Sequence, residues 1–167
     1  MNGLEQVKRA IAKALEDAGV AVQTAYTPGW AKAYRKPVVA VGLRTGESKG
    51  GALGSYLGQR VDPATMDCRE IYGMRLDLVL SLDIYCPAGD GAARSDEVLE
   101  TLHQVVLSGL PAGLRPSELK WEESVWDSGS SMFLRRGSLA CGAFFVAETG
   151  GEQPELTDFI LKGVVTE

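Results

Sequence analysis

The sequence has few of the residues that build catalytic or metal-binding sites. Its 167 residues include one histidine, His103, and three cysteines, Cys68, Cys86 and Cys141. The cysteines are odd in number and widely spaced, without a CxxC pair, which predicts reduced thiols rather than a disulfide framework or a zinc site. His103 falls inside a predicted helix, and the sequence assigns no serine or cysteine nucleophile to it. We therefore expect no enzyme activity, no metal and no cofactor.

A basic excess and long hydrophobic runs are also absent. Lysine and arginine total 17 against 22 aspartates and glutamates, a formal net charge of −5, which argues against general binding to nucleic acid or anionic membranes. No apolar run reaches the roughly 18 residues of a membrane-spanning helix. Residues 1–19 are too polar for a signal peptide. We expect a soluble protein made in the cytoplasm.

Nucleotide-binding and hydrolase motifs are missing as well. TGESKGG at 45–51 lacks the spacing GxxxxGK[ST], and glycine follows Lys49 where a magnesium-binding hydroxyl is required. Neither GxGxxG after a strand nor GxSxG occurs. Asp77 and Asp83 would lie roughly 20 Å apart along an extended strand, whereas a glycosidase pair needs roughly 5–10 Å. A small hydrolase with an unrecognised acid pair is therefore the weakest of the functions considered.

The strongest structural signal is MRLDLVLSLDIY at 74–85, where apolar and mostly polar residues alternate. Side chains alternate across a strand, so this pattern predicts one long β-strand. Asp77 and Asp83 share its polar face. The apolar face consists of Met74, Leu76, Leu78, Leu80, Leu82 and Ile84.

The remaining pattern predicts an α+β fold. Helical periodicity indicates amphipathic helices at 4–18, ended by Gly19, and after Ser95, an expected N-cap. Strands are predicted at 20–26, 38–43, 71–86, 118–127, 132–148 and 159–165. Tight turns between strands favour antiparallel pairing. We expect one domain, 1–167, with a single mostly antiparallel sheet and two helices packed on one face.

Three segments are candidates for contacts with partners. A Gly-rich stretch at about 45–68 predicts a long loop, and Tyr56 and Leu57 give it an apolar handle. The adjacent pair Arg135 and Arg136 would meet an acidic partner, although a simple exposed turn explains the pair equally well. The final predicted strand offers Phe159 and Leu161 to a neighbour.

The chain resembles bacteriophage tail-terminator or tail-completion proteins of the neck in its size, element order and acidity. The resemblance is carried by three segments: GSYLGQRVDP (54–63), REIYGMRLDLVLSLDIYCPAGDGA (69–92) and DFILKGVV (158–165). They are similar to prophage proteins encoded near contractile-tail genes. The resemblance implies a virion structural protein that forms a homohexameric ring on the head-proximal end of the tail tube. Such a ring terminates tail polymerisation and provides the head–tail joining surface.

The resemblance also implies partners and a location. The partners would be other copies of the chain, the tail tube, the sheath, the head–tail connector, and DNA that passes through without sequence-specific binding. The protein would enter the virion after assembly in the bacterial cytoplasm. Asp77 and Asp83 would then face the channel, where acidity repels phosphates. The alternatives are another neck or baseplate component, in a phage or a tail-like bacteriocin, or a cytosolic small-ligand-binding α+β module.

Overall fold

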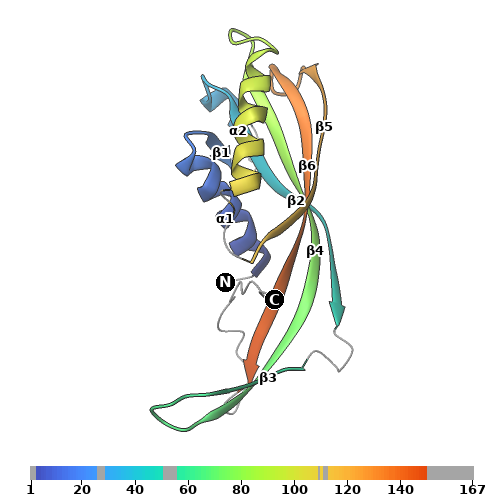
Figure 1. The fold of residues 1–167 in the computed structure, drawn as a ribbon. Helices are drawn as coiled ribbons and strands as arrows, with labels where there is room; N and C mark the ends of the chain where they lie inside the picture. Colours follow the sequence, from blue (N-terminus) through green and yellow to red (C-terminus); the bar gives the residue numbers. More distant parts are fainter. Residues whose placement is uncertain (1–2, 26–28, 51–55, 109, 111–112, 150–167) are drawn as a thin grey trace.

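A computed structural model describes residues 3–25, 29–50, 56–108, 110 and 113–149 (Figure 1). The predicted strand at 159–165, with Phe159 and Leu161, lies outside these residues. The elements are α1 (Gly3–Asp17), β1 (Ala21–Gln23), the 3-10 helix η1 (Trp30–Ala33), β2 (Val38–Gly50), β3 (Tyr56–Val61), β4 (Cys68–Pro87), α2 (Arg94–Ser108), β5 (Arg115–Asp127) and β6 (Met132–Thr149).

The strands form one six-stranded sheet in the order β1-β2-β4-β6-β5, with β3 paired to the first part of β4. Among the described strands, β1 and β2 pair in parallel and all other neighbours pair antiparallel. The predicted α+β class, with one mostly antiparallel sheet and two helices, is confirmed. No described helix has both the length and the apolar character that crossing a bilayer requires.

Both helices lie on one face of the sheet (Figure 1). The apolar side chains of β4 fill the space beneath them, because every second residue of a strand points to the same face. Leu80 is fully buried and meets Leu139 of β6 in register. Helix α1 adds Val7, Ile11 and Leu15, and α2 adds Leu102 and Val105. The apolar face from Leu76 to Ile84 thus forms the core as predicted, whereas Met74 is 36% exposed.

The prediction of a loop at 45–68 is wrong for residues 45–50 and 56–61. Residues 45–50 continue β2, and residues 56–61 form β3, which pairs with residues 68–72 of β4. This part of the sheet projects beyond the two helices (Figure 1). Residues 43–49 and 56–70 are almost all exposed. With no core on either face, these strands show no apolar alternation in sequence.

Helix α2 begins differently from the prediction. It starts at Arg94, so Ser95 lies within the first turn and does not occupy the N-cap. The Ser95 hydroxyl is fully buried and donates a hydrogen bond of 2.6 Å to the Ala92 carbonyl. Asp96 and Glu97 do lie in the first turn, where the helix dipole favours negative charge.

Candidate assembly surfaces

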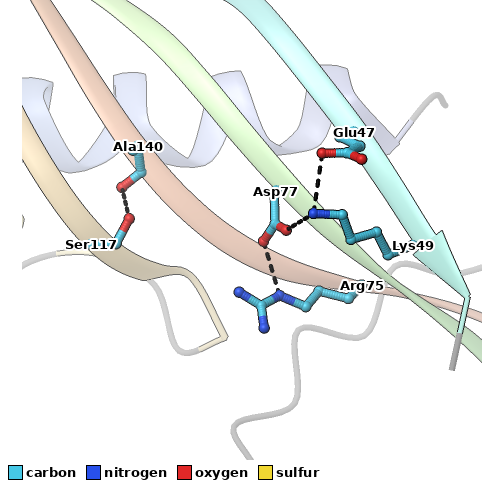
Figure 2. Close-up of polar contacts among 6 residues, drawn as sticks. All are labelled: Glu47, Lys49, Arg75, Asp77, Ser117 and Ala140. Carbon is cyan, nitrogen blue, oxygen red and sulfur yellow. Dashed lines mark hydrogen bonds and ion pairs between the residues drawn. The ribbon is translucent and has the colours of Figure 1, made fainter. Parts of the chain in front are cut away.

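The face of the sheet opposite the helices carries a row of paired charges (Figure 2). Asp77 of β4 accepts a hydrogen bond of 2.9 Å from Nε of Arg75, and its second carboxylate oxygen lies 3.5 Å from Nζ of Lys49. Lys49 also pairs with Glu47 at 3.2 Å. The Arg75 guanidinium, with Lys49 second, lowers the pKa of Asp77, so this carboxyl stays ionised. We call this open side of the sheet the open face.

Asp83 lies on the same face but in a drier environment. Its Oδ1 accepts a 3.1 Å hydrogen bond from the Gly137 amide and lies 3.2 Å from the Arg44 guanidinium. Burial raises the pKa of Asp83 despite both partners. The two acids predicted to face a channel therefore differ, because one is held charged by its neighbours and the other is partly desolvated.

These partners change the electrostatic prediction for the open face. Arg75, Lys49 and Arg44 compensate the two aspartates within hydrogen-bonding or ion-pair distance. The open face is therefore of mixed charge around the two aspartates, whereas the sequence suggested an acidic surface there. Whether Asp77 and Asp83 face a channel stays a prediction.

A groove of about 670 Å³ runs across the open face beside Asp77. Small residues of β6, including Ala140 and Gly142, form part of its lining. Arg75 and Arg115 are the basic residues of the lining. The Ser117 hydroxyl donates a 3.1 Å hydrogen bond to the Ala140 carbonyl along one side (Figure 2). The groove has the size of a ligand site, although sequence inspection did not identify it.

The projecting part of the sheet carries the apolar pair predicted for assembly. Tyr56 packs edge-on against Tyr72 of β4, with ring centroids 5.6 Å apart, and Leu57 is 55% exposed. The Tyr72 hydroxyl donates to the Glu70 carboxylate, and this hydrogen bond raises the pKa of Tyr72. Val61 and Met66 add further exposed apolar surface. This surface has the composition of a contact site.

The two adjacent arginines lie within β6 and point to opposite faces. Arg135 faces the helices, where its side chain is 14% exposed and pairs with Asp96 at 2.8 Å. Arg136 points to the open face and is 4.0 Å from Glu122. The interpretation as an exposed turn is wrong, and Arg135 has little surface left for a partner. The alternation of side chains along the strand predicts that Arg135 faces the helices, because Arg135 shares its face with Leu139 and Cys141.

Edge strand β5 exposes two tryptophans that the sequence did not single out. Trp121 contacts the His103 ring at 4.6 Å between centroids, and Trp126 contacts Phe133 at 5.3 Å. Both remain about half exposed, as does Val125. The sequence signal for this exposed apolar surface was the presence of two tryptophans in a strand that is otherwise rich in charged residues.

The described residues contain no group of three or more histidine, cysteine, aspartate or glutamate side chains placed to hold a metal. His103 Nδ1 lies 3.0 Å from the Leu99 carbonyl within its own helix. Burial raises the pKa of Cys86 and of Cys141 to about 11, so both thiols are protonated at neutral pH.

No protein-family model matches the sequence, and no curated protein matches it either. The fold is that of an α+β protein whose sheet is covered by helices on one face and extends beyond them.

Proposed function

We propose that this protein is a structural subunit of a phage tail or tail-like particle, a tail terminator that forms a homohexameric ring on the head-proximal end of the tail tube. It would end tail polymerisation and present a surface to the head–tail connector. The proposal rests on the sequence phrases at 54–63, 69–92 and 158–165. A related neck or baseplate position fits the same phrases.

The observation that carries the proposal is the sheet that extends past its helices (Figure 1). Tyr56, Leu57, Val61 and Met66 are exposed on this extension. An isolated β-hairpin is marginally stable in water, so such an extension gains most when a neighbour covers it. A subunit whose contacts are made by its own sheet is suited to closed assemblies.

In this proposal Asp77 and Asp83 face the central channel. Their basic neighbours make the channel wall polar and of mixed charge, which offers no continuous basic track to the DNA backbone. DNA would therefore pass without sequence-specific contacts. The tail tube and sheath would meet the projecting strands.

The test uses the full chain mixed with purified tail tubes that lack their terminator. We expect rings at one end of each tube in negative-stain images and tubes that no longer elongate when tube protein is added. Tubes that stay bare and continue to elongate would contradict the proposal.

A matched pair of variants locates the contact. Leu57→Asp places a charge on the projecting strand and should abolish capping. Leu107→Asp makes the same change on α2, where the side chain is 84% exposed, and should leave capping intact. Equal capping by both variants would exclude the projecting strand as the contact.

The groove on the open face favours a second candidate function, a small-ligand-binding module. Its volume of about 670 Å³ is adequate for a small molecule, and Arg75 and Arg115 would select an anionic one. A screen of anionic metabolites for a rise in melting temperature tests this candidate. A rise that Arg75→Ala removes would favour it over the ring.

A further inference from the structure

Two strands of the sheet each leave one edge without a neighbour among the described residues. β1 pairs with β2 only at Val38, Val39 and Ala40, so residues 41–49 have no strand on that side. β5 is the last strand of the sheet at the opposite end. Unpaired edges present rows of backbone donors and acceptors that accept a further strand.

These two edges lie at the same level of the sheet. Paired residues form rows that cross the sheet from β2 through β4 and β6 to β5. The first row runs from Leu43 through Leu80 and Leu139 to Leu119. A second row runs from Glu47 through Asp77 and Gly142 to Arg115, and a third from Thr45 through Val79 and Ala140 to Glu118. Leu43, Thr45 and Glu47 on the β2 edge thus each have a counterpart on β5.

The strand directions are also compatible. Three antiparallel steps, from β2 to β4, to β6 and to β5, separate the two edges, so β2 and β5 run in opposite directions. A second copy placed beside the first in the same orientation would bring its β5 antiparallel to β2. The sheet then continues from one copy into the next with the pairing it already uses.

We propose that a second copy of this chain pairs its β5 with the free edge of β2 in this level register, an interface that rests on the proposed ring-forming function. Glu47 then faces Arg115 of the second copy, and Arg44, in the bulge between Leu43 and Thr45, lies beside Glu118 of the second copy. Leu43 faces Leu119 of the second copy. Opposite charges thus meet at Glu47 and Arg115, and apolar side chains meet at Leu43 and Leu119.

The interface is heterologous, because it joins two different edges. Repetition of a heterologous contact generates a ring if the rotation closes. The exposed side chains agree with such a contact, since Leu43 and Trp121 lie on the facing parts of the two strands. Val125 and Trp126 lie level with the part of β2 that β1 covers, so they stay outside the contact.

The same edges also carry features that discourage uncontrolled pairing. β5 contains Pro116 and has register shifts at two places, and β2 has one beside Arg44. Bulges and prolines are the usual protection of free edges. Residues 118–121 nevertheless keep a regular register with β6, and they are the residues that face β2 at the centre of the proposed contact.

Charge reversal tests the register. Glu47→Arg and Arg115→Glu should each weaken ring association at least about tenfold, because each sets like charges face to face. The two variants mixed in equal amounts should assemble again, since each variant supplies the edge that the other needs. Glu100→Arg on α2 and Lys13→Glu on α1, both exposed and on the helices rather than on either strand, are the matched controls and should assemble normally.

Cysteine cross-linking provides a second readout that does not depend on charge. In a Cys68→Ser background, Leu43→Cys and Leu119→Cys in one chain should give disulfide-linked multimers under mild oxidation. Within one chain these positions are three strand spacings apart, about 14 Å, which is too far for a disulfide. Circular dichroism and melting temperature confirm that each variant folds.

The outcomes separate the interface from the function. Failure of mixed charge variants to reassemble, with no multimeric cross-link, overturns the edge pairing even if the wild type forms rings. A wild type that stays monomeric with and without tubes overturns both proposals. Reassembly on mixing, together with cross-linked multimers, supports the pairing whatever particle the ring belongs to.

Discussion

Arg135 and Asp96 form an ion pair of 2.8 Å that joins β6 to α2 across the covered face of the sheet. The arginine is mostly buried and its Nε has no hydrogen-bond partner among the described residues, whereas the aspartate is largely exposed. The pair therefore anchors a helix on the sheet, and its two members should contribute unequally to stability.

Arg135→Ala should lower the free energy of unfolding by about 1–3 kcal/mol, because it removes both the pair and the packing of the long side chain. Asp96→Ala should cost less than about 1 kcal/mol, since an exposed acid loses little. Urea denaturation measures both. Arg136→Ala, on the open face, is the control, and an equal loss there would show that Arg135 has no special role.

Gly137 is required by the close approach of β4. A Cβ at this position would lie 2.5 Å from the Leu82 carbonyl oxygen, so the backbone must move to admit it. Gly137→Ala should destabilise the fold by about 1–3 kcal/mol through overpacking. A Cβ on Gly89 meets nothing within 4 Å, so Gly89→Ala should have little effect or a small stabilising one. Similar melting temperatures for the two variants would contradict the close contact.

The two open-face aspartates should affect the pH dependence of stability in opposite directions. Asp77 has a lowered pKa, so its contribution is present above the unfolded-state pKa, about 3.9, and disappears as the pH falls through the folded value. Asp77→Asn should therefore be less stable than the wild type at pH 7 and equal to it in acid. Urea titrations from pH 2 to pH 7 test this, and a constant difference would contradict it.

Asp83 has a raised pKa, so its favourable contribution is present below the unfolded-state pKa and is lost as the pH rises through the folded value. Asp83→Asn keeps an oxygen for the Gly137 amide, which should preserve the 3.1 Å hydrogen bond. The variant should gain stability relative to the wild type as the pH rises from 3 to 7. A relative loss over that range would show that the Arg44 pair outweighs desolvation.

The three thiols should react at very different rates. Cys68 is exposed, whereas Cys86 and Cys141 are buried with pKa values raised to about 11 by desolvation. Because the thiolate is the reactive form, a thiol reagent at pH 7.5 should titrate Cys68 rapidly in the folded protein and the other two only in urea. Cys68→Ser should abolish the fast phase. A persistent fast phase in that variant would contradict the burial of the other two.

The sequence predicted those parts of the fold in which burial sets the pattern. Alternation located β4, and helical periodicity located both helices, because each buries one side in a common core. Residues 45–49 and 56–61 gave no such signal, since almost all of them are exposed whichever face they lie on. Their pairing depends on backbone hydrogen bonds to β4, which leave no mark in side-chain pattern.

The candidate site was predicted less completely. Asp77 and Asp83 do share one face, as parity required, but their partners Lys49 and Arg44 come from a strand that was missed in part. Arg135 was grouped with Arg136 by adjacency, although adjacent residues of a strand point to opposite faces. The free edges of β2 and β5 follow from strand order, which periodicity does not encode.

The mass of the assembled protein tests the central proposal most directly. Multi-angle light scattering of the full chain, alone and with terminator-deficient tail tubes, should be combined with negative-stain imaging of the same samples. The proposal predicts a closed ring of six copies, free or at one end of the tubes. A chain that remains monomeric at high concentration and leaves the tube ends bare would contradict it.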